Sequence, residues 1–397
     1  MPSPLDGVRV LDLSRVLAGP QCTSMLGDLG AEVLKVESVV GGDETRSWAP
    51  TVDGEATAFL SVNRNKRSIS VDLGTDRGRQ ILRELVRRSD VLVENFRTGT
   101  MERWGLGYED LRHDSPRLIY AAISAFGRTG ELANHPGYEA VLQAFSGIMS
   151  ITGDADGMPA RSGPSLLDLG TGIVTAHAVT AAVLDRERTG RGQLVETSLL
   201  GTAITLLGYH AQGYLSAAEL PSRLGSGHPA LVPYRAYPCA GGKEVFVAAG
   251  NQSLWERFCL ALGFEDLRDD PRFASLPERR RHRAELDTVL SDRLGKRSRE
   301  DILRQLEAAG VPAAPVNDVG EVLSHPQVRE LAAVQTVNHV GLRRDLELVA
   351  SPFRASAMST GIRRSPPLHG EHTTEVLTEL GYSAKVQREL RDQGVVG

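Results

Sequence analysis

Residues 8–13, Val-Arg-Val-Leu-Asp-Leu, and residues 32–37, Glu-Val-Leu-Lys-Val-Glu, are the two segments that decide the fold class. Both are short runs rich in aliphatic and β-branched residues, which is typical of buried strands. Between them, the apolar residues Met25, Leu26 and Leu29 recur at the spacing of a helix. The sequence therefore predicts a β-α-β unit near the start of the chain.

Elements of the same kind follow this unit. A helical pattern at residues 77–88 lies among three further strand candidates, which are residues 68–73, 91–94 and 118–124. Strands that alternate with helices form parallel sheets that are covered by helices. We therefore expect an α/β protein with a large parallel sheet.

The rest of the chain predicts two apolar helices and then a change of architecture. Residues 165–188 and 199–215 are small and apolar, as in helices that pack against other helices or a partner subunit. Two strand patterns and a series of charged helices then predict a smaller α+β domain. The proline-rich residues 311–316 mark the end of this domain. The predicted parts are a large domain, a linker, the small domain and a return to the large domain, at residues 1–200, 201–225, 226–325 and 326–397.

The composition is that of an ordinary globular protein. The chain has 397 residues, of which 41% are hydrophobic and 24% charged, and the net charge is −5. Because the charges are scattered, we expect neither a nucleic-acid partner nor a membrane surface. One basic cluster, residues 279–283, is interpreted as a solvated helix face.

The cysteines and the apolar segments bear on metals and location. Cys22, Cys239 and Cys259 are too far apart for a zinc knuckle and too few for a disulfide framework. We therefore expect no metal site and a cytoplasmic protein. No secretory signal is recognisable, and no apolar run reaches the roughly 18 residues that a membrane span needs.

Nucleotide and hydrolase motifs are missing from the sequence. Residues 99–107 have neither the dinucleotide nor the P-loop glycine spacing, and no Gly-x-Ser-x-Gly motif occurs. What remains is an isolated acid, Asp168, within Ser-Leu-Leu-Asp-Leu-Gly. This carboxylate can cap a helix that starts near Thr171, or it can act as a nucleophile held at a helix start, and the pattern alone leaves both open. Glu139, Arg15 and Arg97, each taken alone, are more typical of structural residues.

Six motifs occur in chain order, at residues 5–20, 30–37, 63–69, 93–97, 189–193 and 370–373. Taken together, they resemble the class III CoA transferases of the formyl-CoA transferase type. The resemblance implies a Rossmann-like large domain built from both ends of the chain and a smaller domain between them. It also implies a homodimer with interlocked subunits.

The resemblance also implies site residues. Asp168 matches the catalytic aspartate, and Glu139, with Tyr138 beside it, lies near the acyl group. CoA, as part of an acyl-CoA substrate, would contact Val16, Ala18, Val71, Asp72, Leu73, Asn95, Phe96, Arg97 and Arg103. Asp168 would take CoA from the thioester as an aspartyl-CoA intermediate and pass it to a free carboxylic acid. Backbone N–H groups near Gly225 and Gly227 are candidates for stabilising the oxyanion.

Departures from the formyl-CoA transferases point to the substrate. Residues 42–48 and 228–234 look more like members that move CoA between dicarboxylates such as succinate and glutarate. Arg46 and His228 are therefore candidates to hold the distal carboxylate, and a surface or dimer ion pair is the alternative for Arg46. The α-methylacyl-CoA racemases are the main alternative family. Their Gly-His-Asp triplet is replaced here by Gly137-Tyr138-Glu139, which removes their usual base and favours a transferase. A CoA-binding protein without catalysis is the third alternative.

Overall fold

The computed structural model describes residues 3–397. The chain divides into two compact units. The first comprises Met1–Ser146, Ser162–Gly208 and Pro326–Gly397, and the second comprises Gly147–Arg161 and Tyr209–His325. The first unit therefore draws on both ends of the chain, and the second includes a short segment that the sequence-derived boundaries leave in the large domain.

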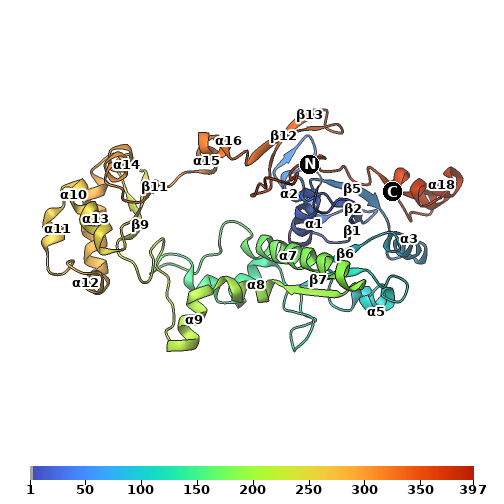
Figure 1. The fold of residues 1–397 in the computed structure, drawn as a ribbon, viewed down its shortest axis with the longest axis horizontal. Helices are drawn as coiled ribbons and strands as arrows, with labels where there is room; N and C mark the ends of the chain where they lie inside the picture. Colours follow the sequence, from blue (N-terminus) through green and yellow to red (C-terminus); the bar gives the residue numbers. More distant parts are fainter. Residues whose placement is uncertain (1–2) are drawn as a thin grey trace. The chain divides into compact units, whose positions relative to one another are not determined.

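Six parallel strands form the sheet of the first unit (Figure 1). They are β1 (Arg9–Asp12), β2 (Glu32–Glu37), β5 (Lys66–Ser70), β6 (Val91–Glu94), β7 (Ile119–Ser124) and β8 (Leu194–Ser198). Their order across the sheet is β5-β2-β1-β6-β7-β8, so the direction of chain progress reverses between β1 and β6. The predicted α/β fold with a parallel sheet is confirmed.

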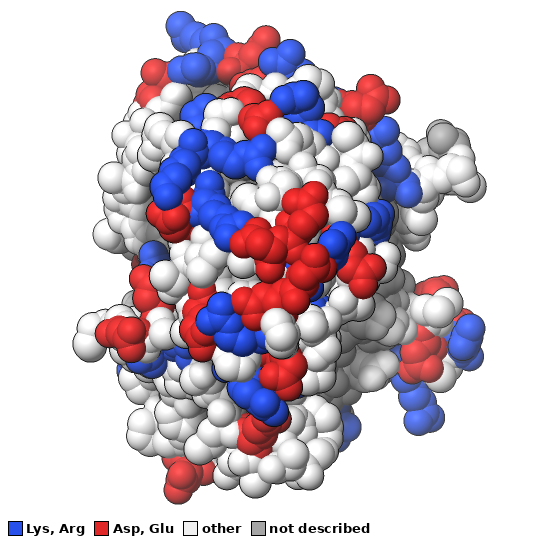
Figure 2. All heavy atoms as spheres, turned by 90° about the vertical axis from the view of Figure 1, so that its left-hand side faces the viewer, with Lys and Arg blue, Asp and Glu red and all other residues white. Residues whose placement is uncertain are grey.

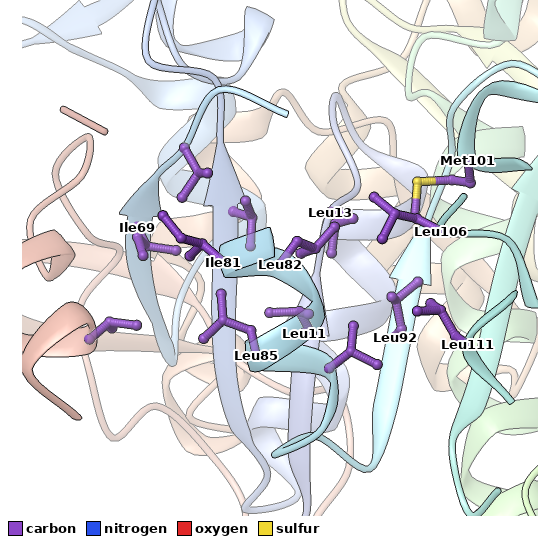
Figure 3. Packing of buried hydrophobic residues seen from close by; sticks show 14 of the residues in the cluster. Leu11, Leu13, Ile69, Ile81, Leu82, Leu85, Leu92, Met101, Leu106 and Leu111 are labelled. Carbon is purple, nitrogen blue, oxygen red and sulfur yellow. The ribbon is translucent and has the colours of Figure 1, made fainter. Parts of the chain in front are cut away.

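Helices cover both faces of this sheet. Leu11 of β1 and Leu13, directly after the strand, pack on one face against α3 (Asp76–Val86), whose residues Ile81, Leu82 and Leu85 are drawn in Figure 3. Asp12, between the two leucines, points to the opposite face, because it accepts a hydrogen bond of 2.7 Å from Thr23 Oγ1 of α1 (Ala18–Asp28). The unit is therefore wound on both sides, as in other sheets of this strand order.

The end of the chain completes the core beside β5. Helices α17 (Thr373–Glu379) and α18 (Ala384–Asp392) contribute leucines and valines to the cluster around α3. Val396 then forms a bridge with Val71, and the Asp72 N–H donates to the Val395 carbonyl at 2.9 Å. Residues from the two ends of the chain thus share one hydrophobic core.

The long helix α7 (Leu166–Thr189) packs against α1, as Figure 1 shows. Gly172 permits the close contact, because a Cβ atom there would lie 2.6 Å from the Ala18 carbonyl oxygen. Among residues 3–397, α7 is the one helix that is long and apolar enough to cross a membrane by length and composition. Its packing on α1 and on strands β7 and β8 accounts for the buried half of that apolar stretch.

Shorter elements complete the first unit. They are η1 (Glu44–Ser47), β3 (Thr51–Val52), β4 (Glu55–Ala56), α2 (Thr57–Val62), α4 (Thr100–Arg103), α5 (Tyr108–Leu111), α6 (Glu139–Phe145), α8 (Leu199–Leu206), α16 (Pro326–Glu330), β12 (Val334–His339) and β13 (Arg344–Val349). The hairpin of β12 and β13 packs through Leu346 and Leu348 against Leu60 of α2.

The second unit contains an antiparallel sheet with the order β11-β10-β9. Its elements are η2 (Ile148–Ile151), β9 (Tyr234–Pro238), β10 (Glu244–Ala248), α10 (Gln252–Leu262), α11 (Glu265–Asp269), α12 (Leu276–Arg281), α13 (Arg283–Gly295), α14 (Arg299–Ala308), β11 (Ala313–Pro315) and α15 (Val319–Ser324), while α9 (Gly208–Ala217) leads into it. Residues 311–316, expected only to end this domain, contain β11, because Ala313 and Pro315 pair with β10.

The interpretation of the basic cluster was wrong for its first residue. Arg279 is fully buried, and its guanidinium donates to the carbonyls of Val232 and Phe273 and lies 5.1 Å from the centre of the Trp255 ring. A run of basic residues does not indicate which of its side chains packs into the core, because the partners of Arg279 lie elsewhere in the sequence. Acidic and basic side chains are intermixed over the face that Figure 2 displays.

One predicted strand begins too late. Strand β5 begins at Lys66 and ends at Ser70, whereas the sequence predicts a strand at residues 68–73. Lys66 is buried and its Nζ donates to Asp12, the Pro20 carbonyl and Asn63, each at 2.9 Å. A lysine can enter the sheet here because these partners satisfy its charge.

Candidate active site

Two loops at the carboxyl edge of the sheet line a pocket of about 200 Å³. One follows β1 and the other follows β6, the two strands between which the strand order reverses. Ligands of doubly wound sheets bind at this position, because the loops diverge there and leave a crevice. The lining residues include Arg15, Val16, Ala18, Asn95, Phe96, Arg97, Ser124, His135, Tyr138, Glu139 and Asp168.

Reciprocal hydrogen bonds join the two loops. The Arg15 N–H donates to Asn95 Oδ1, and Asn95 Nδ2 donates to the Arg15 carbonyl, both at 2.8 Å. The Arg15 guanidinium also lies 5.0 Å from the centre of the Phe96 ring. These contacts fix the relative position of the two loops that form one wall of the pocket.

A buried ion pair supports the loop after β1 through hydrogen bonds to its backbone. Val16 has a φ of +66°, a conformation that a β-branched residue adopts only under constraint. Its N–H donates to Asp43 Oδ1 at 3.2 Å, and Asp43 pairs with Lys35 at 2.9 Å in a fully buried site. Lys35 also donates to the Ser14 carbonyl at 2.8 Å. The pair therefore holds both ends of the strained turn.

Asp168 lies in the first turn of α7. The helix begins at Leu166, so the expectation that Asp168 caps a helix starting near Thr171 was wrong. Within residues 3–397, the Asp168 carboxylate accepts no hydrogen bond, and it faces the pocket. Burial, and secondly the negative charge of Glu139, raise the pKa of Asp168 to about 7. An unpaired carboxylate that ionises near neutral pH is suited to nucleophilic attack.

Glu139 is the first residue of α6 and is buried. Its Oε1 accepts hydrogen bonds from Gln143 Nε2 and, at 3.3 Å, from the Leu167 N–H at the start of α7. Tyr138, the preceding residue, lines the same pocket and is 65% exposed. The structure thus brings Asp168, Glu139 and Tyr138 together, as the resemblance implies.

Four residues proposed for CoA binding lie outside this pocket. Val71, Asp72 and Leu73 follow β5, at the same edge of the sheet as the pocket loops. Arg103 lies in α4, where it donates to Thr100 Oγ1 at 3.0 Å. Their contact with CoA stays a prediction.

The structure places Arg46 outside the pocket and in an ion-pair cluster. Its side chain is only 9% exposed, and it bonds both carboxylate oxygens of Glu37 at 2.8 Å and Glu55 at 2.9 Å. The guanidinium also lies 3.6 Å from the centre of the Phe59 ring. Arg46 thus forms ion pairs, as the alternative to substrate binding predicted. Its partners Glu37 and Glu55 lie in the same chain and have low exposure, so the ion pairs are neither on the surface nor between subunits.

Gly225, Gly227 and His228 belong to the second unit. The Gly225 N–H donates to the Gly153 carbonyl at 2.9 Å, and that of Gly227 donates to the Leu224 carbonyl at 2.9 Å. His228 Nδ1 accepts from the N–H groups of Ala230 and Leu231. The roles of these three residues in the reaction stay predictions.

Sequence reasoning missed several residues that shape the pocket. Residues 133–137, which follow and overlap the turn at 131–134, line it, Asp43 supports Val16, and Gln143 binds Glu139. The polar turn Asn134-His135-Pro136-Gly137, directly before Glu139, was a signal that could have been used. For Asp43 and Gln143 the sequence offers no local signal.

Known proteins match this chain over nearly its whole length. Residues 5–373 match the model of CoA-transferase family III. The chain is 39% identical over 392 residues to a succinate–glutarate CoA-transferase of Agrobacterium fabrum, covering 95% of this chain and 96% of that protein. It is likewise 39% identical over 393 residues to a succinyl-CoA:mesaconate CoA-transferase of Haloarcula hispanica, covering 97% and 98%.

A solved structure agrees with these matches. The crystal structure of a CAIB/BAIF family protein from Brucella suis matches with a TM-score of 0.86 at 36% identity, covering 96% of this chain and all of that one. Sequence and structure thus point to one group of enzymes, and the chain belongs to CoA-transferase family III.

Proposed function

We propose that this CoA transferase moves CoA from a dicarboxylic acyl-CoA, such as succinyl-CoA, to a free dicarboxylic acid through a covalent intermediate on Asp168. The observation that carries the proposal is the Asp168 carboxylate. It lies in the pocket between the loops after β1 and β6, accepts no hydrogen bond from the described residues, and has a pKa of about 7. Simple binding of CoA gives no reason to keep such a group beside a thioester.

The covalent steps conserve the thioester energy. The Asp168 carboxylate attacks the thioester carbonyl and expels CoA thiolate, which gives a mixed anhydride. The thiolate then attacks the Asp168 carbonyl and releases the donor acid as a carboxylate, which leaves an aspartyl-CoA thioester. An acceptor carboxylate attacks that thioester, and the returning thiolate takes the acceptor acyl group and frees Asp168. No net proton is consumed in the cycle.

The pocket loops would hold CoA in a Rossmann-like large domain. We assign the part of CoA near the thioester to Val16, Ala18 and the segment 95–97, and its more distant part to residues 71–73 and Arg103. The common sheet edge of residues 16–18, 71–73 and 95–97 supports this assignment.

A dicarboxylic substrate fits the charges of the pocket. The names of both similar transferases include succinate or succinyl-CoA together with another dicarboxylic acid. Arg46 is already bonded to two glutamates, so we assign the distal carboxylate to Arg15, which lines the pocket and contacts Glu44 only at 3.7 Å.

We also propose a cytoplasmic homodimer with interlocked subunits. Large apolar side chains on α7 and α8 support a partner surface, since Ile173, Val174, Leu184, Ile204 and Leu206 are each between 44% and 56% exposed. An exposed apolar surface of this kind favours association with a second copy of the chain.

Incubation in D₂O with succinyl-CoA, a 2-methylacyl-CoA and a pool of mono- and dicarboxylic acids tests the function. Mass spectrometry of all CoA esters should show new dicarboxylic esters without deuterium, and an Asp168→Asn variant should form none. His135, a candidate base for proton abstraction, also lines the pocket. Deuterium uptake from D₂O reports such an abstraction in the same experiment. Deuterium uptake by the 2-methylacyl ester without any new ester would replace the transferase proposal by the racemase alternative.

A further inference from the structure

Gln143 lies one helical turn after Glu139 on α6, and its side chain is completely buried. Every polar atom of its amide has a partner. Nε2 donates to Glu139 Oε1 and to Ser162 Oγ at 2.9 Å, and Oε1 accepts from the Ser162 N–H at 2.8 Å. The amide therefore connects α6 to the segment that leads into α7.

Both ends of this connection reach the start of α7. Glu139 Oε1 accepts from the Leu167 N–H, one of the helix-terminal donors that have no partner within the helix. Ser165, the N-cap residue, provides no side-chain hydrogen bond of its own. Ser162 Oγ in turn donates to the Pro164 carbonyl at 2.8 Å, directly before Ser165. The first turn of α7 is thus held by contacts that meet at Gln143.

Asp168 is part of that first turn, and its carboxylate accepts no hydrogen bond from the part of the chain that the structure describes. Its position therefore depends on how the backbone around it is held. We infer that Gln143 is a positioning residue, which fixes the first turn of α7, and with it the Asp168 carboxylate, through Glu139 and Ser162. The inference rests on the proposed role of Asp168 as nucleophile.

An amide is the side chain that this position requires. It must donate toward the Glu139 carboxylate and at the same time accept from the Ser162 N–H. A leucine can do neither. A glutamate keeps the acceptor for Ser162 but sets a second carboxylate against Glu139, so Gln143→Glu separates the two contacts.

The test measures the formation of the intermediate directly. Wild-type protein is mixed with succinyl-CoA, and intact-protein mass spectrometry follows the appearance of the CoA adduct in time. We expect Gln143→Leu and Gln143→Glu to slow adduct formation and kcat roughly 10- to 100-fold, as small displacements of a reacting group do. KM for succinyl-CoA should not change, because the loops after β1 and β6 are untouched.

Gln387→Leu is the matched control. Gln387 is also a buried amide, and its Nε2 donates to Thr378 Oγ1 and the Tyr382 carbonyl, far in the sequence from the pocket. It should lower Tm about as much as Gln143→Leu while leaving the rate of adduct formation at the wild-type value. A purely structural role of Gln143 predicts equal behaviour of the two leucine variants.

Ser162→Ala keeps the test decisive if the Gln143 variants do not fold. It removes only the hydroxyl that accepts from Gln143 Nε2 and donates to Pro164, and it should slow adduct formation several-fold at unchanged KM. Wild-type rates in Ser162→Ala and in every Gln143 variant that folds overturn the inference and leave the proposed function intact. A wild-type protein that forms neither adduct nor new esters overturns both.

Discussion

Asp168→Asn should make the protein more stable while it abolishes CoA transfer. The substitution keeps the shape of the side chain and removes a charge that the site disfavours. Burial and the neighbouring Glu139 raise the pKa of Asp168 from 3.8 to about 7. The ionised carboxylate therefore opposes folding at neutral and alkaline pH, and an amide does not.

The magnitude follows from the change in pKa. Since one pKa unit corresponds to about 1.4 kcal/mol, a fully shielded group would contribute about 4 kcal/mol. Asp168 lines an open pocket, and solvent screening reduces this contribution to about 1–3 kcal/mol. The carboxylate also gains about 0.3–1 kcal/mol from its place at the N-terminus of α7, which the amide loses. The expected net gain is about 1–2 kcal/mol at pH 8.

The gain should depend on pH in a defined direction. Below pH 3.8 the folded and the unfolded chains both carry the proton on Asp168, so the substitution changes little. Between pH 3.8 and about 7 the folded state retains the proton longer, and the wild-type protein loses stability as the pH rises. Above that range the full difference between wild type and variant is present.

Urea unfolding of both proteins at equal concentration, at pH 5 and at pH 8, measures this difference. The unfolding midpoint of the Asp168→Asn variant should exceed that of the wild type at pH 8, and by a smaller margin at pH 5. A variant that is less stable at pH 8, or a margin independent of pH, would refute the electrostatic account of the site.

Three further substitutions test the surroundings of the pocket. Glu139→Gln removes a negative charge and should lower the pKa of Asp168, so the half-maximal pH of kcat/KM should move down, and a move upward contradicts this. Lys35→Met leaves Asp43 buried without its partner and should lower the free energy of unfolding by about 3–5 kcal/mol. It should also raise KM for acyl-CoA, because Lys35 supports the loop after β1. An unchanged KM would show that the ion pair does not position this loop. Arg46→Ala breaks two ion pairs of low exposure and should lower stability by about 2–4 kcal/mol, with equal effects on KM for mono- and dicarboxylates. A rise in KM for dicarboxylates alone would instead assign Arg46 to the substrate.

The hydrophobic pattern predicted the sheet well because its strands are buried on both faces. Residues 32–37 and 91–94 coincide with β2 and β6, where the aliphatic residues Val33, Leu34 and Val36 and those of the segment 91–93 mark the strands. The pattern failed at Lys66, whose charge is satisfied by Asp12 in a strand far away in the sequence. It failed again at Arg279, which the Val232 carbonyl and the Trp255 ring accommodate in the core. Such contacts are tertiary and leave no trace in a local window.

The candidate site was predictable only in part. The pattern around Asp168 left capping and catalysis open, and the resemblance of six motifs was needed to choose between them. The apolar pattern of residues 165–188 predicted α7 closely, whereas the capping alternative placed a helix start near Thr171. The contact that stabilises the first turn comes from Glu139 on another helix, which no local pattern reveals. The support of Val16 by Asp43 depends in the same way on a fold that brings separate segments together.

The bridge between Val71 and Val396 has a consequence for the synthesis of the protein. The main part of the second unit, residues 209–325, leaves the ribosome before the last residues of the first unit exist. At typical elongation rates the first unit then waits on the order of ten seconds for its final partners. During that interval the edge of β5 and the leucines of α3 have no cover from α17, α18 and Val396. Nascent chains that stall between residues 326 and 397 should therefore be bound by chaperones, while the second unit can already be folded.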